Sequence, residues 1–438
     1  MQTTAIRMGL VTAMFAAICL APPAGEAAEA AAKRPNIIFI LADDLGYGEL
    51  GCYGQEKIRT PMIDAMAEGG LRFTRMHAGA PVCLPTRCTL MTGLHTGHGR
   101  CRANGGGGNH PMLEEEDTTV ATVLRAAGYK TAMVGKWSLG DLFVGCVVDA
   151  KNRDGSGAIY KHGWDYYFGE PNQTSCHSYY PNQLYRFDRD GLVGRKTDGN
   201  RLDVVPLEGN ATNQTHYTHD LLTEQALAFV DAAKEGPFFL YLPYTIPHSQ
   251  HVVPELEPYA AAASWPEKEK VYASMISRMD RDVGRILERL ERHGIDKNTL
   301  VIFTSDNGPA APGEFNSSGG LPGRKGSFED GGIRVPCVAY WPGTIQAGRT
   351  ADLLSAFWDF MPTFAELAGI RPPAPIDGIS IVPTLLGRGE QPEHDYLFFR
   401  MGSSQRIIRG PGETRSDEEI SGEANTDVIV PKFTANRL

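Results

Sequence analysis

One run of residues most constrains the fold of this 438-residue chain. Residues 36–42 (NIIFILA) are almost continuously apolar and have the length of a β-strand. They lack the alternation of apolar and polar side chains that a strand with one wet face shows, so we expect a strand buried on both faces. Such a strand requires a sheet that is covered on both sides, which is the arrangement of an α/β protein.

Helices and further strands alternate along the rest of the chain. We expect helices from Pro61 onward and over residues 118–127, 219–233, 271–290 and 358–367, and strands over residues 131–134, 237–242, 299–304 and 335–340. This order predicts an α/β fold with a mostly parallel sheet sandwiched by helices, within one domain of residues 31–395. From about residue 400 the chain turns polar, and we expect residues 396–438 to form an irregular C-terminal tail.

The N-terminal 30 residues have the pattern of an export signal. Arg7 supplies a positive charge, residues 9–21 form a short apolar run, and Ala28 and Ala30 offer a small-residue cleavage site. The apolar run is too short to span a bilayer. The sequence therefore predicts a signal peptide over residues 1–30, an exported periplasmic or extracellular protein, and no membrane span.

The charge balance bears on the ligands that the protein binds. Lys and Arg number 42 and Asp and Glu number 52, which gives a net charge of -10. An acidic chain without a basic stripe is poorly suited to nucleic acid, so we expect no nucleic-acid partner. An anionic substrate would need positive charge concentrated at one site.

Two oxygen-rich pairs follow predicted strands. Asp43 and Asp44 come directly after the first strand, and Asp306 and Asn307 come after the strand at residues 299–304. Ligands of open α/β sheets bind at the carboxyl ends of the strands, and carboxylate and amide oxygens suit Ca²⁺, Mg²⁺ or Mn²⁺. Either pair alone is ordinary turn chemistry. The two pairs together favour a metal site.

The segment PVCLPTRCTLMTG, residues 81–93, resembles a signature of the sulfatase family. The shared pattern is Cys83, a proline two residues later, Arg87, and a Thr-Gly pair beyond the arginine. The resemblance implies that a formylglycine-generating enzyme oxidises Cys83 to formylglycine, whose hydrate is the nucleophile and completes the metal shell. Leu84 and Thr86 depart from the commoner residues of the motif. The alternative for Cys83 is a structural thiol or a disulfide partner.

Elementary electrostatics agrees with this resemblance. We expect Cys83 just ahead of a short helix, whose N-terminal amides favour developing negative charge. Arg87, one turn further, could neutralise the oxygen of the nucleophile as it ionises. A surface salt bridge is the alternative for Arg87.

A second segment, residues 128–140 (GYKTAMVGKWSLG), resembles the family motif Gly-Tyr-x-Thr … Gly-Lys-Trp-His-Leu-Gly. The resemblance implies that Lys136 binds sulfate. Ser138 stands where the family has the histidine that takes a proton as sulfate leaves, and serine is a very poor base. We therefore expect a burst of alcohol followed by slow turnover, unless a nearby histidine such as His95, His98 or His110 has taken over that role.

Two later segments complete the resemblance. His248 lies in a Pro-His segment, residues 244–248, and the resemblance implies contact with the sulfate and the leaving group. Lys325, in residues 323–336, resembles a second sulfate-binding lysine, and Asp306 could accept the proton of the nucleophile. Tyr179 to Pro181 resemble a region that shapes substrate access.

Three histidine pairs have a spacing that could hold zinc: His95/His98, His216/His219 and His248/His251. None belongs to a His-Glu-x-x-His motif. We expect loop or surface histidines in all three pairs, with His248 as the exception.

The resemblance extends from about Pro35 to Asp395 and implies a calcium-dependent sulfuric ester hydrolase with an alkaline-phosphatase-like fold. Its substrate would be an aryl or carbohydrate sulfate, which means a sulfated small molecule or glycan. Family members add a small C-terminal sheet, and the polar tail predicts a truncated or divergent version of it. One alternative is a phosphoester or phosphonate hydrolase on the same scaffold. Another is a weakly active homologue that binds sulfated glycans.

Overall fold

The computed structural model describes residues 34–105, 112–140, 156–310, 315–410 and 418–420. The predicted signal peptide and His110 lie outside the described residues. The described residues belong to one compact unit. Within the part of the chain that is described, no helix combines the length and apolar character needed to cross a membrane.

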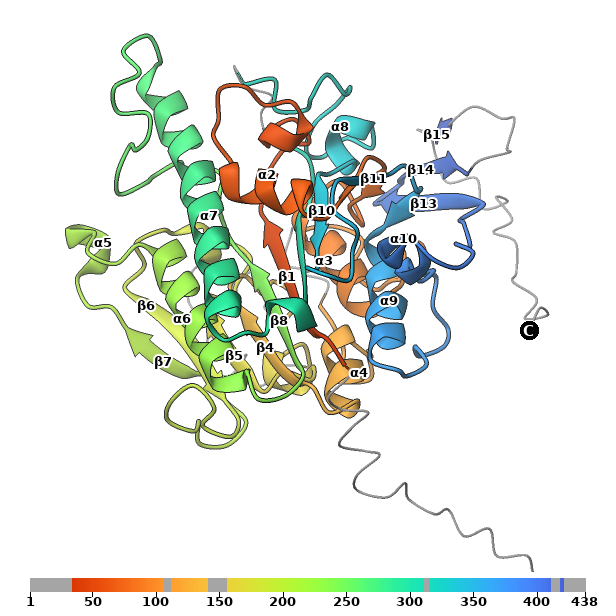
Figure 1. The fold of residues 1–438 in the computed structure, drawn as a ribbon. Coiled ribbons are helices and arrows are strands. Elements are labelled where there is room, and N and C mark those ends of the chain that lie inside the picture. Colours follow the sequence, from red (N-terminus) through yellow and green to blue (C-terminus); the bar gives the residue numbers. More distant parts are fainter. Residues whose placement is uncertain (1–33, 106–111, 141–155, 311–314, 411–417, 421–438) are drawn as a thin grey trace, which may run out of the picture. The chain divides into compact units, whose positions relative to one another are not determined.

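A ten-stranded sheet forms the centre of the fold (Figure 1), with the strand order β11-β2-β10-β9-β1-β8-β4-β5-β6-β7. The strands run β1 Asn36–Ala42, β2 Leu71–Phe73, β4 Lys130–Val134, β5 Tyr166–Gly169, β6 Gln183–Asp188, β7 Asp203–Pro206, β8 Phe238–Pro243, β9 Thr299–Ser305, β10 Cys337–Tyr340 and β11 Arg349–Ala351. The five neighbours from β9 to β5 are parallel to one another, whereas β10, β6 and β7 pair antiparallel. The predicted α/β class with a mostly parallel sheet is confirmed.

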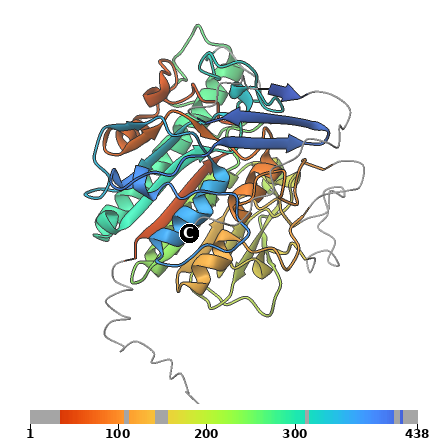
Figure 2. The same cartoon turned by 90° about the vertical axis from the view of Figure 1, so that its right-hand side faces the viewer.

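Helices cover both faces of this sheet. The helices are α2 Pro61–Glu68, α3 Cys83–Thr92, α4 Val120–Ala126, α5 Asn210–Asn213, α6 Thr218–Ala233, α7 Glu267–Arg292, α8 Asp330–Ile333, α9 Phe360–Leu367 and α10 Val382–Leu386. Residues of α3, α4 and α9 share one hydrophobic core, and residues of α2, α6 and α7 share the other. Figure 2 shows α9 lying along β1.

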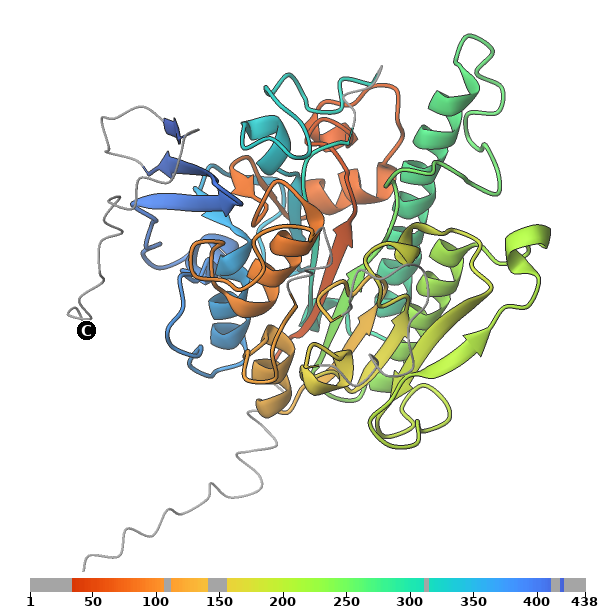
Figure 3. The ribbon, with the colours of Figure 1, turned by 180° about the vertical axis from the view of Figure 1, so that it is seen from behind.

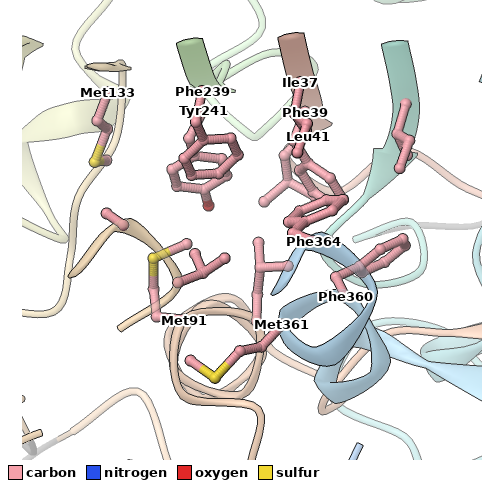
Figure 4. Packing of buried hydrophobic residues seen from close by; sticks show 14 of the residues in the cluster. Ile37, Phe39, Leu41, Met91, Met133, Phe239, Tyr241, Phe360, Met361 and Phe364 are labelled. Atoms are coloured by element: carbon pink, nitrogen blue, oxygen red, sulfur yellow. The ribbon is translucent and has the colours of Figure 1, made fainter. Parts of the chain in front are cut away.

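The buried strand β1 contributes to both cores, as its apolar run predicts. Ile37, Phe39 and Leu41 point into the core under α9 (Figure 4), and the residues between them face the core under α6 and α7. The Phe39 ring packs edge-on against Phe360, with 4.8 Å between ring centroids. Burial of such large apolar side chains stabilises the central strand by about 1.5–3 kcal/mol each.

The expectation of an irregular tail from residue 396 is wrong for its first part. β13 Tyr396–Met401 and β14 Ser404–Arg409 pair antiparallel, and β15 Glu418–Ile420 pairs with β14. Figure 3 shows β13 and β14 beside α9 and away from α7. A separate pair of short strands, β3 Met76–His77 and β12 Ser355–Ala356, is parallel. The hairpin was missed because only one face of β13, the apolar face with Leu397 and Phe399, is fully buried, and because β14 is mostly polar.

That apolar face makes a third, small core. Leu397 and Phe399 of β13 and Ile408 of β14 are buried together with Trp358. In β13 the buried Leu397 and Phe399 alternate with half-buried or exposed residues, and β14 is mostly polar and half-buried, so the polarity of the segment conceals the hairpin. Residues 411–417 and 421–438 lie outside the described residues.

Candidate active site

The two oxygen-rich pairs meet at the carboxyl ends of β1 and β9. The parallel register aligns Ala42 with Ser305, so the residues that follow each strand emerge side by side. The amide of Asp44 donates to Asp306 Oδ1 at 3.1 Å, and Asn307 Nδ2 donates to Asp44 Oδ1 at 2.7 Å. Asp44 has a φ of 68°, a left-handed conformation that turns the chain sharply after β1. Asp43 is also fully buried here.

Helix α3 brings the predicted nucleophile to this edge. Cys83 is the first residue of α3, not a residue ahead of it, and its Sγ lies 3.3 Å from Asp43 Oδ1. Arg87, one turn further along α3, donates to Asp306 Oδ2 at 2.7 Å and lies 3.3 Å from Asp43 Oδ2. Both side chains are fully buried, so Arg87 is not the surface residue of the alternative interpretation.

Lys136 and Lys325 reach the carboxylates of Asp43 and Asp44 from two different parts of the chain. Lys136, just after β4, lies 2.7 Å from Asp43 Oδ2. Lys325 Nζ lies 2.6 Å from Asp44 Oδ1 and 3.3 Å from Cys83 Sγ. Burial alone would lower the pKa of Lys136, but Asp43 raises it overall, so the ammonium stays charged. The acidic protein thus concentrates cations at one point, as an anionic substrate requires.

The carboxylates at this point repel one another. Burial, and then the charge of Asp43, raises the pKa of Asp306 to about 6 and also raises the pKa of Asp44. Burial opposes ionisation of Asp43 as well, but Lys136 and His248 hold its pKa well below the ordinary value. A cation held among these groups would favour their charged forms.

The donor set fits a divalent cation with oxygen ligands. Asp44 Oδ2 and Asn307 Oδ1 are fully buried and accept no hydrogen bond from the described residues. Unsatisfied acceptors of this kind are costly unless a donor or a cation reaches them. Potential ligand atoms of Asp43, Asp44, Cys83 and His248 all lie within 4.8 Å of one another. Three of the predicted metal ligands, Asp43, Asp44 and Cys83, thus lie together with His248, and the other two, Asp306 and Asn307, are hydrogen-bonded to Asp44.

The thiol of Cys83 is held in its neutral form. Burial, followed by the charges of Asp306 and Asp43, raises its pKa well above the ordinary value. A neutral thiol is a weak nucleophile and a weak ligand. Unmodified, Cys83 is therefore poorly suited to act in this site.

His248 lies where the sequence predicts, and a second histidine accompanies it. His248 Nε2 is 3.5 Å from Asp44 Oδ2, at the end of a segment that follows β8. The His177 ring, from the short 3₁₀ helix Ser175–His177, stacks on it with centroids 3.5 Å apart. His177 Nε2 also lies 3.0 Å from Lys136 Nζ and 3.6 Å from Asp43 Oδ2.

Sequence reasoning missed His177. Its one local signal is its position just before Tyr179, in the segment expected to shape substrate access. Tyr179 is buried and its hydroxyl donates to the backbone oxygen of His248 at 2.8 Å. The same segment therefore supports both stacked rings.

Ser138 is buried two residues after Lys136, and its amide donates to the Pro171 oxygen at 3.0 Å. Two of the histidines that the alternative named as its replacement, His95 and His98, contact Asp377 instead. His98 Nδ1 is 2.8 Å from Asp377 Oδ1, and the His95 ring stacks on His98 at 4.3 Å.

The expectation of loop or surface histidines is wrong at one position. His95 lies in a loop after α3, although it is largely buried, whereas His219 is fully buried in α6, with its Nε2 3.0 Å from Asp282 Oδ2. The packing of α6 against α7 buries His219, and the spacing of histidines along the chain does not reveal that burial. His216 and His251 are exposed, as expected.

Comparison with known proteins defines the class. The model of the Sulfatase family matches residues 35–370, which is more than half of the chain. The chain belongs to the sulfatase family and is an enzyme of that family, with the fold that its sheet and helices describe.

Two relatives that are named as sulfatases are similar to most of this chain. N-acetylgalactosamine-6-sulfatase of Mus musculus is 33% identical over 411 residues, covering 88% of this chain and 72% of that protein. Arylsulfatase A of Homo sapiens is 34% identical over 392 residues, covering 84% of this chain and 71% of that protein.

Solved structures share the fold. Ps i-CgsB, in complex with k-i-k-neocarrahexaose, superposes with a TM-score of 0.67 at 29% identity, covering 86% of this chain and 82% of that one. The phosphonate monoester hydrolase of Agrobacterium radiobacter superposes with a TM-score of 0.60 at 22% identity, covering 86% and 87%, which shows a common fold alone.

Proposed function

We propose that the protein hydrolyses sulfate esters to an alcohol and sulfate, with a formylglycine made from Cys83. One observation carries the proposal: Cys83 starts α3 at a point where Lys325, Arg87 and two carboxylates converge in a buried site. When present, the hydrated formylglycine supplies an oxygen nucleophile to which the sulfate group is transferred. The neutral thiol of unmodified Cys83 would not serve that purpose.

The surrounding residues have separable tasks. Lys136 and Lys325 offer charge to the sulfate oxygens as compact cations. Arg87 would stabilise negative charge at position 83, and Asp306, whose carboxylate contacts Arg87, is the proposed acceptor of a proton from the nucleophile. His248 is the candidate contact for the leaving oxygen.

Calcium is the proposed metal. Asp43, Asp44, Asp306 and Asn307 would hold it with hard oxygen ligands, together with an oxygen at position 83. The unsatisfied buried acceptors on Asp44 and Asn307 support this assignment. Bound Ca²⁺ would supply positive charge for the sulfate and for the nucleophile.

A sulfated small molecule or glycan is the proposed substrate. Relatives are named for N-acetylgalactosamine-6-sulfate and aryl sulfates, and one neighbouring structure contains a neocarrahexaose. Maturation would require a formylglycine-generating enzyme. The N-terminal pattern supports export to the periplasm or the exterior.

The test combines mass spectrometry with an assay. Protein produced with a formylglycine-generating enzyme is digested, and the peptide containing position 83 is weighed; we expect the aldehyde or its hydrate. The same protein should release sulfate from an aryl sulfate, and Cys83→Ala should not. Faster hydrolysis of a phosphonate monoester than of any sulfate ester tested would favour the rival hydrolase instead.

A further inference from the structure

Helix α3 carries a second cysteine besides the proposed nucleophile. Cys88, within α3, and Cys101, in the segment that follows the helix, are both fully buried in the core shared by α3, α4 and α9. The Cys101 thiol donates a hydrogen bond to the Cys88 sulfur, which also accepts from the backbone amides of Arg100 and Cys101. The two sulfur atoms are therefore direct neighbours.

This contact between two sulfurs sets the pair apart. The pair also lacks the ligands of a metal site, because within the described part of the chain no third His, Cys, Asp or Glu brings a ligand atom close to both. The other described cysteines contact polar groups instead of a second sulfur: Cys83 meets Asp43, Cys176 the backbone oxygen of Gln173, Cys52 the Asp64 carboxylate, and Cys337 the Thr304 hydroxyl.

We propose that Cys88 and Cys101 form a disulfide bond when the chain folds under oxidising conditions. The inference goes beyond the proposed hydrolase activity and does not depend on it. Cysteines whose side chains point apart cannot be bridged without moving the backbone, whereas these two thiols already meet. An exported protein folds in an oxidising compartment, where such bonds form and persist.

The oxidant in this step is a donor disulfide, carried by a thiol–disulfide oxidoreductase or by oxidised glutathione. One cysteine thiolate attacks a sulfur of the donor, which forms a mixed disulfide and releases one donor thiol. The other thiolate then attacks the protein sulfur of the mixed disulfide, and the second donor thiol leaves. The two cysteines lose two electrons and two protons, which the donor gains. The reaction precedes the final packing of α3, because both sulfurs are inaccessible in the folded protein.

The bond would leave the proposed nucleophile free for its own modification. Cys83 Sγ faces the carboxylate of Asp43, whereas Cys88, five residues later on the same helix, faces the hydrophobic core. Once Cys88 is joined to Cys101, neither can capture the Cys83 thiol. The bond would also anchor the segment that returns to the start of α3, where Asn104 Oδ1 accepts from the amide of residue 84 at 3.0 Å.

Peptide mass spectrometry tests the pairing directly. Trypsin cleaves after arginine and so separates the three cysteines, with Cys83 in residues 76–87, Cys88 in residues 88–100 and Cys101 in residues 101–102. Full-length protein is unfolded with iodoacetamide and without reductant, and then digested. We expect residues 88–100 linked to residues 101–102, two hydrogens lighter than the two free peptides together. Reductant before alkylation should replace this species with two alkylated peptides.

Two preparations make this result independent of where the protein is located in the cell. One is protein exported by its own N-terminal segment, and the other is protein that has been reduced, unfolded and refolded with a mixture of reduced and oxidised glutathione. We expect the link in both. The peptide of residues 76–87 reports the state of Cys83, so preparations with the same group at position 83 are compared.

Thermal unfolding supplies a second measurement with matched variants. We expect the disulfide form to melt about 2–5 °C above protein refolded in reductant. Cys88→Ala and Cys101→Ala should each lose this difference between the oxidised and reduced preparations. Cys337→Ala, which removes another fully buried cysteine, should lower both melting temperatures and keep the difference.

Two results would overturn the inference. One is alkylation of Cys88 and Cys101 in protein refolded with oxidised glutathione, and the other is a link from Cys88 to a cysteine other than Cys101. Failure of the proposed function looks different, because the linked peptide would then be found in a protein that releases no sulfate from a sulfate ester.

Discussion

Arg87 and Asp306 form a fully buried ion pair, with 2.7 Å between Nη2 and Oδ2, that joins α3 to the end of β9. The same guanidinium lies 3.3 Å from Asp43, so one cation balances two carboxylates. Through this pair the helix that carries the proposed nucleophile is tied to the edge of the sheet that carries the proposed metal ligands. The contact therefore serves stability and chemistry together.

Removing Arg87 should destabilise the fold. Arg87→Ala leaves Asp306 without its ion-pair partner and leaves Lys136 as the nearest cation of Asp43, and breaking a buried pair from one side costs about 3–5 kcal/mol. Arg87→Lys keeps the positive charge but lacks the planar guanidinium, so it should lose less stability than Arg87→Ala. Thermal unfolding with and without Ca²⁺ measures both effects. Equal melting temperatures for Arg87→Ala and wild type would contradict this account.

Replacing Asp306 should weaken calcium binding. Asp306→Ala removes one of the proposed ligands and the carboxylate that accepts from the amide of Asp44. We expect calorimetry to show a loss of Ca²⁺ affinity of at least about tenfold, as removal of even an outer-shell partner of a metal site typically causes. Exposed Glu366→Ala, on α9, is the matched control and should bind normally. Unchanged affinity in Asp306→Ala would remove Asp306 from the site.

Cys83→Ser should separate two steps of the reaction. Serine offers one hydroxyl, so it can accept sulfate, but it has no second hydroxyl on the same carbon from which to expel it. Steady turnover should fall by orders of magnitude while the melting temperature changes little, because the substitution removes no packing volume of note. Sustained turnover near the wild-type rate would show that the second hydroxyl is dispensable.

The sequence predicted those parts of the site that have a local signal. The apolar run of β1 and the turn residues after it locate Asp43 and Asp44, and a helix start locates Cys83. Lys325 has no such signal and was identified only by resemblance. His177 could not be identified, because its position at Lys136 depends on how the segment after β5 folds back over β4.

The same limit applies to the rest of the fold. The amphipathic period of α7 and the buried strand β9 predicted elements within a few residues of their bounds. The β13–β14 hairpin was missed because its strands are buried on one face only. Its inward residues are recognisable once Trp358 is known to lie beneath them.

A buried carboxylate outside the active site should make stability depend on pH. Asp280 of α7 accepts from the Ile63 amide at 2.8 Å and the Met62 amide at 3.2 Å, at the start of α2. Burial raises its pKa from 3.8 to about 7. Because the folded pKa exceeds the unfolded one, this contribution to stability is complete below about pH 3.8 and is lost as the pH rises towards about 7.

Asp280→Asn tests that contribution. The free energy of unfolding of wild type relative to the variant should fall between about pH 5 and pH 7, with a slope of up to about 1.4 kcal/mol per pH unit. Urea unfolding at several pH values measures the difference. Parallel pH profiles for the two proteins would show that Asp280 does not titrate in this range.

The C-terminal hairpin should be an integral part of the fold. Phe399 is fully buried, and its ring lies 5.4 Å from Trp358 and 6.3 Å from His77, which belongs to the short strand β3. Phe399→Ala should cost about 3–5 kcal/mol, because it opens a cavity over Trp358. Exposed Arg400→Ala, the next residue of β13, should stay within about 0.5 kcal/mol. Urea unfolding compares the two variants. If β13 were only loosely attached to the catalytic fold, Phe399→Ala would unfold at the same urea concentration as Arg400→Ala, and a chain ending at Asp395 would be as stable as the full one.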